Sequence, residues 1–195
     1  NQDVRDSESL MALTLISTPL DITVSDTAVA SVSITSGITS TYDSYEFHFV
    51  NMHPATDQVF FQFQVNASDD TGGGFDTSVI TSSAFLAYHF EGDASGLSYS
   101  GTQDLAQSAS HQRLTQEVGN NADQSASGIL TLYAPASTTY TKNFTARFAD
   151  SGYNDYVEDH HVAGYINQTL AIPEISFKFH SGNIDAGTIK MFGVT

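Results

Sequence analysis

The residues YEFHF at positions 45–49 and FQFQV at positions 61–65 decide the fold class. In both stretches an apolar side chain occupies every second position. Successive side chains of an extended chain point to opposite faces, so a period of two predicts strands with one buried face. The polar residues that alternate with these apolar ones, Gln62 and Gln64 among them, are expected to point outward. The predicted core phenylalanines are Phe47, Phe49, Phe61, Phe63, Phe177 and Phe179.

The rest of the chain continues as short strands separated by turns. Further strands are predicted near residues 28–34, 79–90, 127–134, 140–149, 161–168, 174–180 and 187–194. Turn residues are concentrated in positions 69–74, 91–101, 150–155 and 180–187. Residues 103–118 differ, because apolar residues recur there at near-helical spacing and Gly119 can end a helix. The predicted fold is an all-β antiparallel β-sandwich, jelly-roll-like, with one short surface helix.

Residues 1–18 lack the pattern of the remainder. They are polar and then weakly apolar, and alternation begins only after Pro19. We therefore predict an N-terminal docking arm over residues 1–18 and a β-sandwich domain over residues 19–195. The arm is expected to bind another chain rather than its own sandwich. A short helix from Ser7 is the alternative.

Composition excludes several classes of partner. Of the 195 residues, 24 are Ser and 21 are Thr, which suits strands and turns. The chain carries 22 acidic and 6 basic residues, a net charge of −16. Affinity for nucleic acids and for anionic membranes depends on Lys and Arg, so we predict that the protein binds neither. It has no cysteine and therefore neither disulfides nor thiolate metal sites.

An acidic loop is the first candidate metal site. Asp69, Asp70 and Asp76 flank the glycines of TGGGF at positions 71–75 and could supply the oxygen ligands that calcium prefers. Their spacing fits no EF-hand, and no Lys and helix follow to hold a phosphate. We predict a solvated loop, with a structural calcium as the alternative.

A second cluster mixes carboxylates with imidazoles, namely Asp155, Glu158, Asp159, His160 and His161. Zinc favours such donors. Neighbouring side chains on a strand point to opposite faces, however, so at most one of the two histidines can join a given site. We predict solvated carboxylates here and no metal.

Motifs for catalysis are absent from the sequence: there is no Walker-type loop, dinucleotide fingerprint or nucleophile elbow. Glu46 and His48 share one strand face, where we predict polar surface or an intersubunit contact rather than acid–base chemistry. Glycoside hydrolysis needs two carboxylates at a defined separation, and nothing in the sequence pairs its acids. The prediction is a non-enzymatic protein without cofactor or metal.

Four tyrosines near predicted loops are candidates for contact with a glycan. Sugar-binding sites combine an aromatic platform with convergent polar groups. Packing in the core is the alternative for each ring. The four are Tyr88, Tyr99, Tyr153 and Tyr156.

Four longer segments of the sequence resemble a known protein family. They are STYDSYEFHFVNMHPATDQVFFQFQVN at 40–66, SASGILTLYAPASTT at 125–139, VAGYIN at 162–167 and IPEISFKFHSGNIDAGTIKMFGV at 172–194. In this order they resemble structural proteins of marine tailed phages, cyanophages among them, and the resemblance extends over residues 20–195. It implies a non-enzymatic protein on the outer surface of the virion, in a tail fibre or appendage or as head decoration. It brings no catalytic motif.

The resemblance also implies partners. These are other virion proteins, bound through the arm, and copies of the same chain in a symmetric oligomer, with a trimer favoured. The alternative function is a carbohydrate-binding module that contacts the host surface. A polysaccharide-degrading enzyme ranks last.

Overall fold

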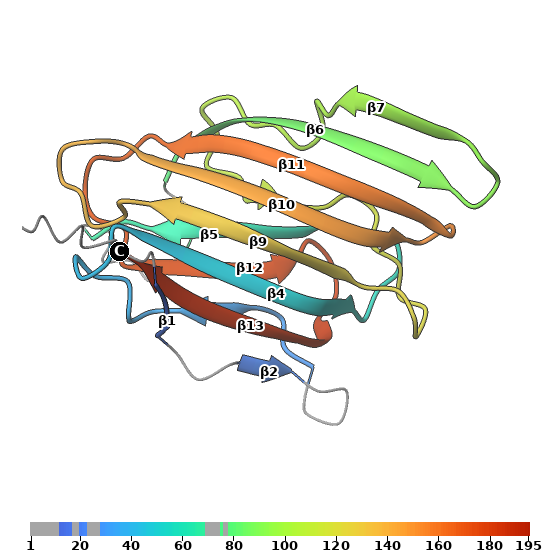
Figure 1. The fold of residues 1–195 in the computed structure, drawn as a ribbon, viewed down its shortest axis with the longest axis horizontal. Coiled ribbons are helices and arrows are strands. Elements are labelled where there is room, and N and C mark those ends of the chain that lie inside the picture. The colour runs from blue at the N-terminus through green and yellow to red at the C-terminus, as the bar shows by residue number, and fades with distance from the viewer. Residues whose placement is uncertain (1–11, 17–19, 23–27, 69–74, 76–77) are drawn as a thin grey trace, which may run out of the picture.

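The computed structural model describes residues 12–16, 20–22, 28–68, 75 and 78–195, which form two antiparallel sheets and no helix (Figure 1). The larger sheet has the strand order β1 (Leu13–Leu15), β13 (Ile184–Val194), β4 (Ser44–Pro54), β9 (Ala126–Tyr133), β10 (Lys142–Gly152), β11 (Tyr156–Ile166), β6 (Ile80–Phe90) and β7 (Ser95–Tyr99), and β2 (Leu20–Ile22) also pairs with β13. The smaller sheet has the order β3 (Val32–Ile34), β12 (Glu174–Phe179), β5 (Phe61–Asn66) and β8 (Gln112–Arg113).

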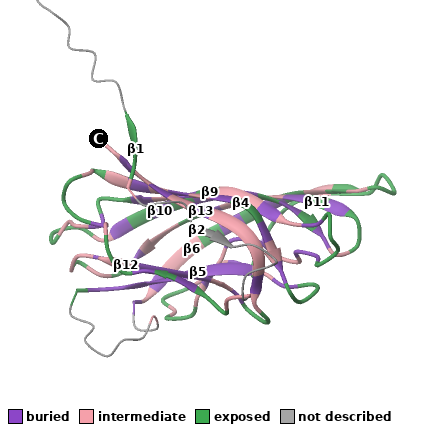
Figure 2. Cartoon of the chain, turned by 90° about the horizontal axis from the view of Figure 1, so that it is seen from below, coloured by how far each residue is buried: buried purple, intermediate pink, exposed green. Residues whose placement is uncertain are grey.

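The two sheets pack face to face, and the larger one lies as a curved layer over β5 and β12 (Figure 2). Phenylalanine rings from both sheets meet between them. The ring centroid of Phe49 on β4 lies 4.8 Å from that of Phe177 on β12 and 5.4 Å from that of Phe61 on β5. All six predicted core phenylalanines are buried. The predicted antiparallel sandwich is confirmed.

A long hairpin, β10–β11, runs through the middle of the larger sheet. Its register extends from Lys142 opposite Ile166 to Gly152 opposite Tyr156. Every second residue of β10 is buried along the whole strand. Residues 150–152, predicted to belong to a turn, continue β10 because they pair with the start of β11. Residues 95–99, also predicted as part of a turn, form β7 against β6.

The predicted helix over residues 103–118 is wrong. Apart from β8, this segment has no regular structure and runs beside β5 and β6. Ile80 and Ser108 exchange backbone hydrogen bonds of 2.8 and 3.0 Å, and the amide of Leu114 donates to the carbonyl of Phe61 at 2.8 Å. Backbone groups that a helix would pair internally are paired with strands instead, so tertiary pairing overrides the helical spacing.

The same segment covers the side of β5 that faces away from the phenylalanine core. The side chain of Gln64 donates to the carbonyls of Ala109 and Ser110 at 2.8 and 3.3 Å. Both Gln62 and Gln64 are buried. The expectation that they point into solvent is wrong, and for Gln64 the reason is that Ser78, Ala109 and Ser110 lie against its side chain.

Part of the predicted arm lies on its own sheet. β1 pairs with the last residues of β13, and the amide of Ile16 donates to the carbonyl of Met191 at 2.9 Å. β2 pairs with residues 187–189 of β13. The pairing of residues 13–15 with β13 therefore differs from the expectation that the arm does not bind its own sandwich. The arm's residues 1–11 and 17–18 lie outside the described residues, and docking of the arm on another chain stays a prediction.

We predict that Phe61→Ala lowers the free energy of unfolding by about 3–5 kcal/mol, because it removes a buried ring from the packed interface between the sheets. Val157→Ala, at a half-exposed position on β11, is the control and should change stability by less than about 0.5 kcal/mol. Denaturant unfolding measures both variants. Equal stability of Phe61→Ala and the parent would contradict the register of β5.

Candidate functional site

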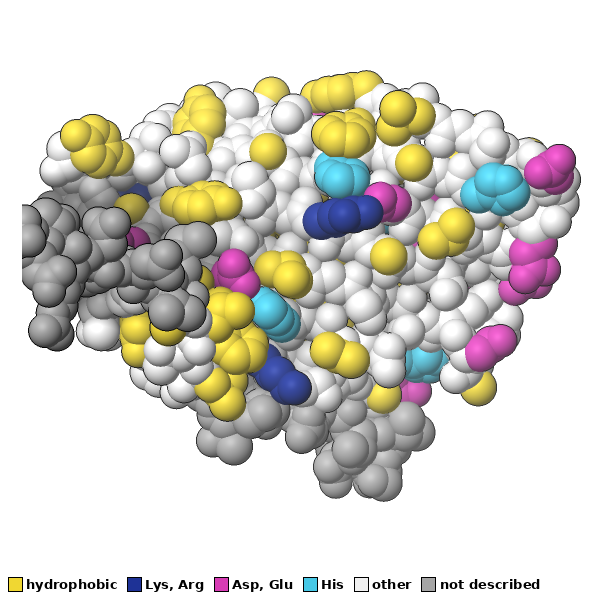
Figure 3. Space-filling view, viewed as in Figure 1, with side chains coloured by type: hydrophobic (Ala, Val, Ile, Leu, Met, Phe, Trp, Pro, Cys, Tyr) yellow, Lys and Arg dark blue, Asp and Glu magenta, His cyan; other side chains and the backbone are white. Residues whose placement is uncertain are grey.

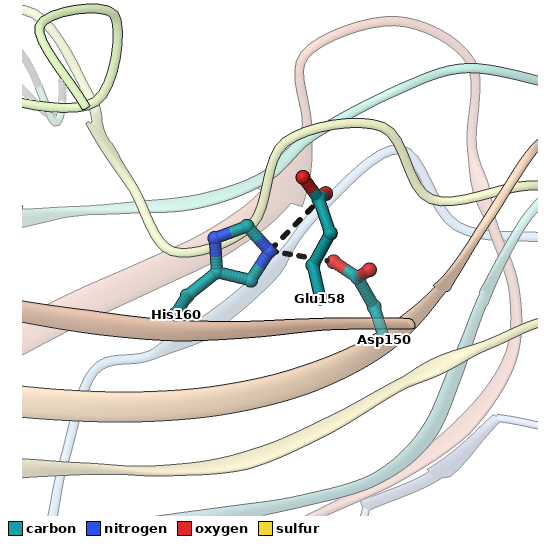
Figure 4. A group of neighbouring side chains, drawn as sticks. All are labelled: Asp150, Glu158 and His160. Atoms are coloured by element: carbon teal, nitrogen blue, oxygen red, sulfur yellow. Dashed lines mark hydrogen bonds and ion pairs between the residues drawn. The ribbon is translucent and has the colours of Figure 1, made fainter. Parts of the chain in front are cut away.

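A cluster of three polar side chains lies inside one end of the sandwich, where Asp150 of β10 and Glu158 and His160 of β11 point toward one another (Figure 4). His160 Nε2 is 3.0 Å from Asp150 Oδ2 and 3.4 Å from Glu158 Oε2. The side chains of Asp150 and His160 are fully buried, and that of Glu158 is nearly so. The hairpin explains the meeting: Asp150 is directly opposite Glu158, and His160 follows two residues later on the same face.

Gln103 holds the other side of the imidazole. Nδ1 of His160 lies 3.1 Å from Nε2 and 3.4 Å from Oε1 of the Gln103 amide. Gln103 is fully buried, and its carbonyl accepts a hydrogen bond of 2.7 Å from Gln112 Nε2. Both ring nitrogens thus lie within contact distance of buried polar side chains.

Burial and charge act against each other in the cluster. Burial lowers the pKa of His160, but contacts with Asp150 and Glu158 outweigh this effect and raise the pKa to about 9. Burial raises the pKa of Asp150, which the hydrogen bond to His160 opposes. The charge of Glu117 also raises the pKa of Asp150. Two carboxyl groups therefore act on the imidazole, and Glu117 adds a third acidic group near Asp150.

One carboxylate oxygen of the cluster, Asp150 Oδ1, has no hydrogen-bond partner, and Glu158 Oε2 has only its ion-pair contact with His160. Buried polar atoms in folded proteins are nearly always paired, so these oxygens mark a shortage of positive groups. Ligand atoms of Asp150, Glu158 and His160 lie within 4.8 Å of one another, close enough to hold a metal ion.

A shallow hollow of about 360 Å³ opens beside the cluster, and Glu158 forms part of its wall. Tyr156 and Glu117 also line it, and the Tyr156 hydroxyl donates to Glu117 Oε2 at 2.9 Å. Burial, and then the charge of Glu158, raises the pKa of Tyr156 and keeps the hydroxyl protonated. Small polar side chains complete the wall, namely Ser98, Ser100, Thr102 and Gln116.

Three of the four candidate tyrosines meet at this hollow. Tyr88 of β6, Tyr99 of β7 and Tyr156 of β11 line it. Tyr99 is 62% exposed, and its hydroxyl donates to Asp104 at 2.6 Å. Tyr153 does not line the hollow, although its ring lies edge-on to that of Tyr156 at 6.4 Å.

Strand alternation divides the predicted cluster at 155–161 between two faces. Asp159 and His161 lie on the outer face, where the guanidinium of Arg147 pairs with Asp159 at 2.9 Å. Glu158 and His160 lie inside. The expectation that Glu158 is solvated is wrong, because β11 begins at Tyr156 and directs position 158 into the interior.

Of the remaining acidic candidates, the structure describes only Asp155. Asp155 is exposed in the turn between β10 and β11. Asp69, Asp70 and Asp76 lie outside the described residues.

The sequence-based prediction missed Asp150, Gln103 and Glu117. Asp150 could have been found, because it continues the every-second-residue pattern of Phe144 and Phe148 on the same strand. Gln103 and Glu117 belong to the irregular segment 103–118, whose near-helical spacing predicted a helix and gave no indication of which side chains point inward.

The outer face of the larger sheet carries scattered apolar side chains and few charges (Figure 3). Phe85, His161, Arg147 and Ile129 stand side by side on four neighbouring strands. We call these four residues the outer row. The rings of Phe85 and His161 stack at 4.7 Å with an interplanar angle of 4°, and Phe85 is 48% exposed.

Glu46 and His48 lie on this same outer face, as their shared strand face predicted. His48 is paired in register with Ile129 of the outer row and with Lys190 of β13. His48 Nε2 contacts Glu46 Oε2 at 2.8 Å. Both side chains are part of the sheet surface and face no cleft with the polar cluster.

Comparisons with known proteins leave the family open: no protein-family model, curated protein or solved structure matches this chain. Within the described part of the chain, none of the elements is a helix long and apolar enough to cross a membrane.

We predict that His160→Gln destabilises the fold by about 3–5 kcal/mol, because it leaves buried carboxylates without their charged partner. His161→Gln is the matched control, one residue away on the outer face, and should stay within about 0.5 kcal/mol of the parent. Thermal and denaturant unfolding of the two variants test this. Similar losses in both would show that burial of the cluster contributes little.

Proposed function

We propose that this protein is a non-enzymatic structural protein of a bacteriophage virion, exposed on the particle in a tail fibre or appendage or as head decoration. The resemblance to marine phage structural proteins supports a location in the virion. The sequence segments that carry this resemblance include β4, β5, β9, β12 and β13, which contribute to both sheets of the sandwich. A stable β-sandwich with an N-terminal arm suits an assembled particle.

The observation that carries the structural role is the open outer face of the larger sheet. A chain of net charge −16 repels its own copies over most of its surface. On the outer face the acids Glu46 and Asp159 are balanced by Arg147 and Lys190. Apolar side chains of the outer row stand among them. This face is therefore where copies of the chain can approach with the least repulsion, and we assign it to a homo-oligomer, with a trimer favoured.

Phe85→Asp should convert the oligomer to monomers, because it places a further acid in the contact. Light scattering coupled to size-exclusion chromatography measures the mass. Tyr140→Asp, at a 73% exposed loop position, is the control and should leave the mass unchanged. A wild-type monomer at high micromolar concentration, or an unchanged oligomer in Phe85→Asp, would count against this face.

The place on the particle has its own test. Quantitative mass spectrometry of purified virions gives the copy number, and hundreds of copies indicate head decoration. A handful, in multiples of three or six, indicates a tail appendage. Absence from purified particles would contradict the virion assignment.

Binding of a host-surface glycan is a second candidate function, favoured by the hollow. Tyr99 offers an exposed ring, Tyr88 and Tyr156 form part of the wall, and Glu117 offers a carboxylate that can accept from sugar hydroxyls. Aromatic surface beside convergent polar groups is the pattern of carbohydrate sites. The hollow is shallow, which suits one or two sugar units at the end of a longer glycan.

Tyr99→Ala should weaken glycan binding by at least about tenfold, since losing about 1.4 kcal/mol of contact corresponds to that factor. The position is largely exposed, so folding should be unaffected. Tyr140→Ala removes another largely exposed ring elsewhere and serves as the control. A glycan array followed by titration of any glycan that binds measures both. Failure of all host glycans to bind the parent would exclude this function.

A further inference from the structure

We propose that Asp150, Glu158 and His160 form a binding site for a divalent transition-metal cation of the Zn²⁺ or Mn²⁺ class. This inference goes beyond the virion role and does not depend on glycan binding. It also departs from the sequence-based expectation of no metal, which rested on solvated carboxylates.

The spacing of the ligand atoms fits a small cation. Ligands about 2.0–2.1 Å from a tetrahedral zinc lie roughly 3.3 Å from one another. His160 Nε2 is 3.0 Å from Asp150 Oδ2 and 3.4 Å from Glu158 Oε2. The three groups come from two adjacent strands of one hairpin, so the backbone holds them together before any cation arrives.

An unpaired oxygen points independently to a ligand. Asp150 Oδ1 is buried and lacks a hydrogen-bond donor, and Glu158 Oε2 has only the 3.4 Å contact with His160. Leaving a buried carboxylate oxygen unpaired is costly, and a cation beside it removes that cost. Glu117, hydrogen-bonded to Tyr156, adds a further negative charge nearby.

Gln103 supplies the support that metal-bound histidines usually have. A ligating imidazole commonly donates its other N–H to a carbonyl or carboxylate, which sets its tautomer and orientation. Here Nδ1 of His160 faces the Gln103 amide, with Nε2 at 3.1 Å and Oε1 at 3.4 Å, and a flip of that amide brings Oε1 into place to accept the hydrogen bond. The buried Gln112 in turn holds Gln103 through its carbonyl.

The donor set selects the class of metal. One imidazole and two carboxylates suit Zn²⁺, Mn²⁺ and similar ions. Calcium takes six to eight oxygen ligands and makes no use of an imidazole. Three protein ligands leave a further coordination position, and Glu158 places the site beside the hollow that Tyr88 and Tyr99 also line.

The test uses the whole chain after removal of metals with a chelator. Zn²⁺ titrated by isothermal calorimetry should bind at one ion per chain and raise the unfolding temperature, since a ligand that binds only the folded state stabilises it. Co²⁺ in place of Zn²⁺ should give visible absorption bands typical of a low-coordinate nitrogen–oxygen site.

Variants locate the ion. Asp150→Asn and Glu158→Gln keep the shape of the side chains but remove a charge, and each should lower Zn²⁺ affinity at least tenfold. Asp159→Asn and His161→Gln change an acid and a histidine on the outer face of β11 and should stay within about twofold of the parent.

Two results would overturn the proposal. One is a folded parent, verified by circular dichroism, that binds neither Zn²⁺ nor Co²⁺ at a stoichiometry near one. The other is affinity that survives Asp150→Asn and Glu158→Gln but falls in the outer-face variants. Should the inner variants not fold, the parent's titration and Co²⁺ spectrum decide alone. No glycan or phage enters these measurements, so their outcome is separate from that of the proposed function.

Discussion

The pairing of β10 with β11 is the constraint on which the interior depends. The eleven-residue register obliges alternate residues of both strands to face the smaller sheet and the segment 103–118. Toward one end these positions are apolar, as with Phe144 and Val162, and toward the other they are Asp150, Glu158 and His160. One ladder therefore builds both the hydrophobic core and the polar cluster.

The polar end of the interior is enclosed by the segment that follows β7. Residues 103–118 contribute Gln103 and Glu117 to the wall, and their backbone bonds to β5 and β6 fasten the segment in place. The apolar end supplies the hydrophobic stabilisation that the buried carboxylates do not. The free-energy cost of burying those charged groups is thus offset by phenylalanine packing elsewhere in the same sandwich.

Much of this fold could be predicted from the sequence, because strand alternation is a local signal. The alternating phenylalanines of 45–49 and 61–65 gave this signal, and the structure buries them as predicted. The helix predicted over 103–118 failed for a non-local reason: its backbone partners are Phe61 and Ile80, far away in sequence. The tyrosines were identifiable as candidates, but their meeting at one hollow depends on how β6, β7 and β11 are ordered in the sheet. No single-sequence pattern contains that order.

The edge of the larger sheet at β13 has a consequence for assembly. β1 and β2 occupy it through short pairings, three residue pairs each. A neighbouring copy cannot extend the sheet there by adding a strand while these segments stay in place, which protects against open-ended growth of strands. The β13 edge of every copy is chemically the same, however. If β1 were exchanged between neighbours by domain swapping, each pairing could re-form across the boundary with the same hydrogen bonds. After such an exchange, β1 would link two subunits instead of covering the sheet edge of its own subunit.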